Sequence, residues 1–173
     1  RILYAIFDEP KDIFEYLRNW KGPKVDSLII SAHGWDRGLA QNKPKSTQVT
    51  LDELAERYSQ NDFSHVMNNG GQIYLSACST NREYQKQLTI AEYLSYLFNS
   101  PVTGALRVSI SIHEGLRGPA NVGKPTGKPA KASWYNEEGD PRVGNVNLTP
   151  HQTVYPNDVK EEVQTYLNSK NSR

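Results

Sequence analysis

Two short apolar runs, each followed at once by a residue that can do chemistry, constrain the fold of this chain most strongly. The run over residues 28–32 leads into His33 and Gly34, and the run over residues 73–77 leads into Cys78. Both runs have the length and the β-branched or aromatic content of buried strands. Because functional groups of α/β proteins usually lie at one edge of the sheet, we expect both strands to end there.

Segments with helical periodicity alternate with these strands. Helices are expected over residues 10–20, over 51–58, and from just after Cys78 to residue 98, and Thr50 to Glu53 has the spacing of a capping box. Strands are expected over residues 2–7, 27–32, 72–77 and 101–112, with a loop over 35–48 and a turn at 69–71. This alternation is typical of a mostly parallel sheet flanked by helices on both faces, so we predict an α/β fold.

Cys78 is the only cysteine of the chain, so it has no internal disulfide partner. A second capping-box spacing, Thr80 to Glu83, follows it directly and predicts that a helix begins just after Cys78. Free backbone N–H groups and the positive end of the helix dipole would then favour the thiolate over the ordinary thiol, whose pKa is about 8.5.

The last third of the chain has a different composition. Residues 115–132 are rich in glycine and proline, with Arg117, Lys124, Lys128 and Lys131 interleaved, which is typical of an extended basic loop. Short strands are expected at residues 134–135 and 143–148, as a hairpin around 138–141, and a final helix is expected to be capped by Asn157. We predict one domain over residues 1–173, with its core in residues 1–112 and an irregular C-terminal third.

The composition excludes some classes of function. With 173 residues, one domain is expected, and 20 basic against 19 acidic residues argue against nucleic-acid or membrane binding driven by total charge. The chain has no long apolar stretch and no signal-peptide pattern, and because it begins at Arg1 we expect an excised fragment or a processed product. No histidines and cysteines occur at zinc-ligand spacing, and His65 and His151 are interpreted as ordinary histidines.

The order of these motifs resembles the caspase-like clan of cysteine peptidases. This clan takes in caspases, legumain, clostripain, gingipains and the self-cleaving domains of large bacterial toxins. Its members share an apolar strand ending in His-Gly and, 40 to 50 residues later, a second one ending in Ala-Cys. The resemblance covers about residues 1–112 and implies that His33 carries the proton and Cys78 is the nucleophile. It also implies an oxyanion hole made by backbone N–H groups at Gly34 and Cys78.

These residue types suit the chemistry independently of the family. A thiolate attacks the scissile carbonyl, preorganised N–H donors stabilise the oxyanion, and a protonated imidazole supplies the leaving amine with its proton. Glycine after the histidine lets the backbone approach a substrate closely. For the substrate pocket, Asp36 and Glu114 are candidate acids, whereas Arg107 would receive an acidic side chain. Ser76 stands two positions before Cys78, close to where relatives that cut after Arg or Lys often place an acid.

Three functions stay open. The first is a cysteine endopeptidase acting on a protein or peptide, such as a bacterial effector or a toxin's processing domain at work in a reducing host cytosol. The second is a cysteine acyltransferase or hydrolase of permuted papain-like fold, which predicts an antiparallel sheet. The third is a non-catalytic relative that binds protein. No cofactor is expected. The basic loop is interpreted as a mobile surface loop, with binding of an anionic activator such as inositol phosphate, or processing of the loop itself, as the alternatives.

Overall fold

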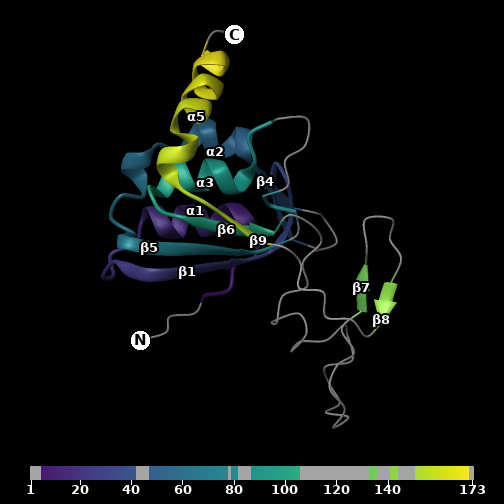
Figure 1. Cartoon of the computed structure of the whole chain (residues 1–173). Coiled ribbons are helices and arrows are strands. Elements are labelled where there is room, and N and C mark those ends of the chain that lie inside the picture. The colour runs from purple at the N-terminus through teal and green to yellow at the C-terminus, as the bar shows by residue number, and fades with distance from the viewer. Residues whose placement is uncertain are drawn as a thin grey trace.

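A four-stranded mixed sheet forms the centre of the molecule (Figure 1). The computed structural model describes residues 5–41, 47–77, 79–81, 87–105, 133–135, 141–143 and 151–171. The strands are β1 (Val25–Ser31), β5 (Met67–Ser76), β6 (Val102–Ala105) and β9 (His151–Val154), in the order β1-β5-β6-β9. The pairs β1–β5 and β5–β6 are parallel and β6–β9 is antiparallel, so the fold is α/β with a mostly parallel sheet, as predicted.

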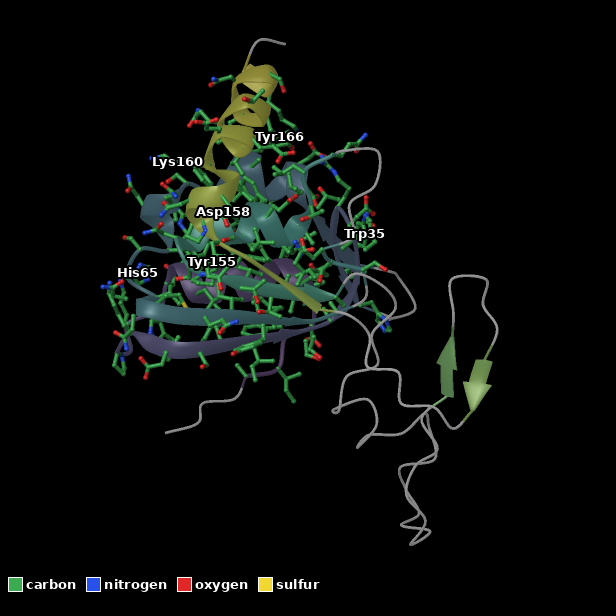
Figure 2. All side chains as sticks on the ribbon, in the orientation of Figure 1. Trp35, His65, Tyr155, Asp158, Lys160 and Tyr166 are labelled. Carbon is green, nitrogen blue, oxygen red and sulfur yellow. The ribbon has the colours of Figure 1, made fainter. Side chains whose placement is uncertain are left out.

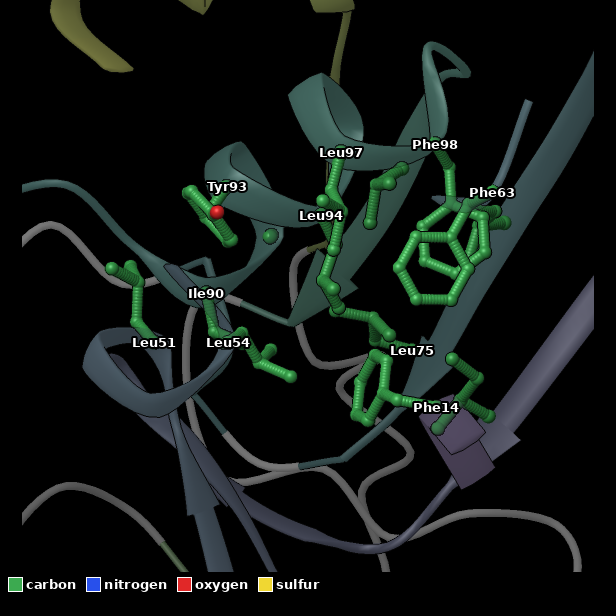
Figure 3. Packing of buried hydrophobic residues seen from close by; sticks show 14 of the residues in the cluster. Phe14, Leu51, Leu54, Phe63, Leu75, Ile90, Tyr93, Leu94, Leu97 and Phe98 are labelled. Carbon is green, nitrogen blue, oxygen red and sulfur yellow. The ribbon is translucent and has the colours of Figure 1, made fainter. Parts of the chain in front are cut away.

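One hydrophobic cluster joins the helices to this sheet. The helices are α1 (Pro10–Arg18), α2 (Leu51–Arg57), α3 (Ile90–Phe98) and α5 (Pro156–Asn171), with the short 3-10 helix η1 (Gln60–Asp62) after α2. Each of the four helices buries apolar side chains in the cluster, and Figure 3 labels some of those from α1, α2 and α3. The strands contribute alternate residues that share one face of the sheet, namely Ile30, Ile73, Leu75, Val102 and Val154.

The opposite face of the sheet corrects the expectation of helices on both faces. A row of side chains crosses it in register, in the order Ile29, Tyr74, Thr103 and Thr153. Ile29 is 60% exposed and Tyr74 is 40% exposed. In the part of the chain that the structure describes, the helices therefore cover one face only, which Figure 1 shows as helices stacked above the sheet.

A second sheet occupies most of the described part of the segment 35–48, where a loop was expected, so that expectation is wrong for residues 35, 38–41 and 47–48; residues 42–46 lie outside the described residues. The strands β2 (His33–Trp35), β3 (Gly38–Gln41) and β4 (Thr47–Thr50) pair antiparallel in sequence order. Leu39 and Val49 bury this sheet against the core. At the β2–β3 turn, the Trp35 ring lies over Gly38, where a Cβ atom would come within 2.6 Å of both the ring and the Val49 carbonyl oxygen. This close approach explains why glycine occupies that position.

The remaining comparisons concern where strands begin and end and which strands were predicted. Residues 5–7 are not a strand, and the turn expected at 69–71 lies inside β5, where the pairing with β1 shifts register and Gly70 has φ of 81°. The strand expected from residue 101 is β6, and its predicted continuation over 106–112 lies outside the described residues. β9 was not predicted. A short pair does form between β7 (Ser133–Tyr135) and β8 (Pro141–Val143), close to the hairpin that was expected.

Capping boxes begin two of the helices. Thr50 and Glu53 form the predicted box at α2. For α3, the box is Thr89 with Glu92, and not Thr80 with Glu83. Thr80 lies in a turn, is fully buried, and its hydroxyl makes no hydrogen bond in the described structure. The first helix begins at Pro10, as predicted. The last begins at Pro156, so Asn157 is its second residue and not the predicted cap.

Gly38→Ala should destabilise the protein by about 1–3 kcal/mol, because the new methyl group meets the Val49 backbone as well as the Trp35 ring. Gly22→Ala is the matched control, since the atoms nearest to its methyl group belong to the Trp20 side chain and not to the backbone. Urea unfolding of both variants checks this. Equal losses of unfolding free energy would contradict the account of the β2–β3 turn.

Candidate functional site

The two strands that precede the candidate residues end level with each other. Ser31, the last residue of β1, pairs with Ser76, the last residue of β5, and the Ala32 N–H donates to the Ser76 carbonyl at 3.3 Å. His33 follows Ser31 by two positions, and Cys78 follows Ser76 by two positions. Cys78 itself lies outside the described residues. The expectation that both strands end at the same edge of the sheet is confirmed.

His33 begins strand β2 and is exposed, and Gly34 follows it half-buried in the same strand. The two residues pair with Ala40 and Leu39 of β3. The backbone at His33 and Gly34 is therefore part of a hairpin, which fixes its direction as it leaves the edge of the main sheet.

The turn of this hairpin is bound to the N-termini of two helices. The carbonyl of Asp36 accepts from the Ile90 N–H of α3 at 2.7 Å, and the carbonyl of Arg37 accepts from the Leu51 N–H of α2 at 2.8 Å. First-turn N–H groups have no partner within their own helix, so each of these bonds satisfies two groups at once. Asp36, a candidate pocket residue, thus lies at the far end of the hairpin from His33, with its side chain half-buried.

The segment after Cys78 is held in the same way. Ser79 has φ of 50°, a left-handed conformation that is strained for a residue with a side chain. The Thr80 carbonyl accepts from the Ala91 N–H of α3 at 3.1 Å, and the Asn81 N–H donates to the Ala105 carbonyl of β6 at 3.0 Å. Backbone strain of this kind persists only where the surroundings enforce it, and it is enriched at functional sites.

Asn81 is a further residue that the sequence did not single out. Its side chain is buried, donates to the Gln152 carbonyl of β9 at 3.2 Å, and accepts from the Thr89 hydroxyl at 3.4 Å. The only sequence signal was a polar pair, Thr80 and Asn81, directly after an apolar strand. Its partners lie far along the chain, so the pattern alone could not identify them.

The dipole argument for a Cys78 thiolate needs correction. The helix that follows in the described chain is α3, which begins twelve positions later at Ile90. Its first three N–H groups are already used: Ile90 donates to Asp36, Ala91 donates to Thr80, and Glu92 donates to the Thr89 side chain. These three N–H groups are therefore not free to stabilise a thiolate; Cys78 and residues 82–86 lie outside the described residues.

The Arg37 side chain belongs to a charged cluster next to the hairpin turn. It donates to the Leu88 carbonyl at 3.1 Å and to Asp52 of α2 at 3.0 Å, and lies 5.5 Å from the centre of the Tyr166 ring. Asp52 also accepts from the Tyr166 hydroxyl and from Lys170, both on α5. Partial burial opposes ionisation of Asp52, but the hydrogen bonds from Lys170, Tyr166 and Arg37 outweigh it and lower its pKa to about 2.

The other candidate residues divide into two groups. Ser76 ends β5 beside Ser31 and is half-buried, so it lies at the edge where the strands end. Arg107, Glu114 and the basic loop from Arg117 to Lys131 lie outside the described residues. An open groove of about 490 Å³ lies beside α5 and Arg37, and none of His33, Asp36 and Ser76 lines it. This groove is therefore separate from the described candidate residues His33, Asp36 and Ser76.

Two further observations apply to the described ranges alone. No three His, Cys, Asp or Glu side chains gather there closely enough to hold a metal ion. None of the helices in the same ranges is both long enough and apolar enough to cross a membrane.

Asp52→Asn should lower the unfolding free energy near pH 7 by roughly 1 kcal/mol, since solvent screens this partly exposed cluster. Because the folded-state pKa of Asp52 is lowered, its contribution is present above about pH 4 and is lost as pH falls towards 2. The difference between the parent and the variant should therefore shrink over that range in denaturant titrations. Glu56→Gln, at an exposed partner of Lys170, is the control and should change little. A difference that is constant with pH would contradict this prediction.

The comparisons with known proteins add no relative. No protein-family model, no curated protein and no solved structure matches this chain. The case for a function therefore depends on the chain's own residues and geometry.

Proposed function

We propose that this chain is a cysteine endopeptidase domain of the caspase-like type, with Cys78 as nucleophile and His33 as proton carrier. The observation that carries the proposal is the pairing of Ser31 with Ser76, because it ends two parallel strands level with each other. His33 lies two positions after the end of β1, and Cys78 lies two positions after the end of β5. Together they can act as a base and a nucleophile.

The proposed reaction assigns one role to each group. The Cys78 thiolate attacks the carbonyl carbon of the scissile peptide bond, and backbone N–H groups of Gly34 and Cys78 stabilise the resulting oxyanion. Protonated His33 gives its proton to the leaving amine as the C–N bond breaks. Water, deprotonated by His33, then hydrolyses the acyl-enzyme and frees the thiolate. The exposure of His33 at the start of β2 supports this role, because a substrate can reach it.

The direction of the strands weighs against one alternative. A permuted papain-like acyltransferase or hydrolase needs its cysteine packed on an antiparallel sheet, whereas β1, β5 and β6 pair in parallel. The other alternative is a non-catalytic relative that keeps this scaffold for protein binding. Activity measurements distinguish it from a peptidase.

The substrate in this proposal is a protein or peptide. Asp36 and Glu114 stay proposed as acidic pocket residues, and Arg107 stays the candidate for an acidic substrate side chain. Ser76 would border the cleft, since it lies half-buried at the end of β5. For the basic loop, binding of an anionic activator such as inositol phosphate stays the alternative to a plain surface loop.

Cleavage of a mixed peptide pool, followed by mass spectrometry with and without inositol phosphate, tests the proposal. Cys78→Ala should abolish cleavage, and His33→Ala should lower the rate by about 10²–10⁴-fold, the usual contribution of a proton carrier. His65→Ala is the matched control. Figure 2 shows His65 on the opposite side of the molecule from Trp35, which shares strand β2 with His33, so this variant should cleave like the parent.

Two results would overturn the assignment. Cleavage that survives Cys78→Ala would show that another nucleophile acts. A parent protein that cleaves no peptide under either condition would favour the non-catalytic relative.

A further inference from the structure

The position of His33 depends on how the β2–β3 hairpin is held. His33 pairs with Ala40 at one end, and Trp35 pairs with Gly38 at the other, next to the turn of Asp36 and Arg37. Both strands belong to the three-stranded sheet β2-β3-β4, whose backbone pairing connects the turn to the end that carries His33.

The Arg37 side chain ties this turn to three helices. Its guanidinium donates to the Leu88 carbonyl, which precedes the cap of α3, and to Asp52 in the first turn of α2. Its cationic face lies over the Tyr166 ring of α5, and Tyr166 in turn donates to Asp52. Arg37 is only 23% exposed, so this contact is more than a solvated surface pair.

The geometry suits arginine specifically. A guanidinium is a planar fork whose separate N–H groups can reach a carbonyl and a carboxylate while its face stacks on an aromatic ring. A lysine ammonium at the same place could form the ion pair with Asp52, but could not stack and bridge in the same way.

We infer that Arg37 is a positioning residue for the reaction proposed above. Through the hairpin, Arg37 aligns His33 and Gly34 with the end of β5. It does so by binding the turn to the first turn of α2, to the segment before α3, and to α5. This inference rests on the proposed function and adds that the C-terminal helix contributes to the alignment of the histidine, through Tyr166 and Asp52.

The test measures the rate of Cys78 alkylation by iodoacetamide between pH 5 and 9, together with the melting temperature of each variant. Arg37→Ala should lower the rate near pH 6 by at least about tenfold and shift the pH profile towards that of His33→Ala, with Arg37→Lys between them. In the double variant Arg37→Ala with His33→Ala, no further loss is expected, because both changes remove the same effect.

Arg18→Ala is the matched control. Arg18 also pairs with a carboxylate, Asp62 at 3.1 Å, and also lies over a tyrosine ring, Tyr58 at 5.9 Å, but it belongs to α1. It should lower the melting temperature without changing the pH profile of alkylation.

The outcomes separate the inference from the proposed function. If Arg37→Ala lowers the melting temperature but leaves the parent's pH profile unchanged, or adds its full loss to that of His33→Ala, Arg37 has a structural role only and the inference is wrong. If the parent already reacts like the same thiol in the unfolded protein, the proposed function fails and the inference fails with it.

Discussion

The parallel pairing of β1 with β5 is the constraint on which the rest of the structure depends. Ile30 and Leu75 are partners on the buried face, and Ile73 lies beside them with no exposed surface. Since strand side chains alternate between faces, a slip by one residue would turn Ile30 out to solvent and bring Ile29 into the core. Burial therefore sets the register, and the register sets where each strand ends. The level ends that support the proposed function follow from packing.

The N-terminus of α3 links the two sides of the candidate site. Adjacent N–H groups bind its two halves: Ile90 donates to Asp36 of the hairpin turn, and Ala91 donates to Thr80 after the cysteine. The capping box of Thr89 and Glu92 fixes where the helix begins, and so where these donors lie. These backbone N–H groups would otherwise lack hydrogen-bond partners. At this one helix end, they hold two segments that are distant in sequence.

Local patterns predicted the fold well where the signal lies within a few residues. The Thr50 to Glu53 box, the helical spacing from Pro10 and the strand before His33 were all identified in this way. The sequence offers a capping-box spacing at Thr80 and another at Thr89, and the box that begins α3 is the one at Thr89. The backbone of Thr80 and Asn81 instead binds α3 and β6, and Glu83 lies outside the described residues. The β2–β4 sheet escaped prediction although its strands are neighbours in sequence, because residues 35–48 are polar and show no strand periodicity. The strand β9 and the roles of Asn81 and Arg37 escaped it because they depend on distant partners.

A cross-linking measurement tests the register most directly. In a Cys78→Ala background, Ser31→Cys with Ser76→Cys places two thiols on partner residues of neighbouring strands, about 5 Å apart at Cα, within the range of a disulfide. The account predicts that mild oxidation joins this pair within one chain. It also predicts that Ser27→Cys with Ser76→Cys, offset by four residues and so by roughly 13 Å along the strand, stays reduced. Cross-linking of the offset pair, or its absence in the matched pair, would contradict the register and the level strand ends that depend on it.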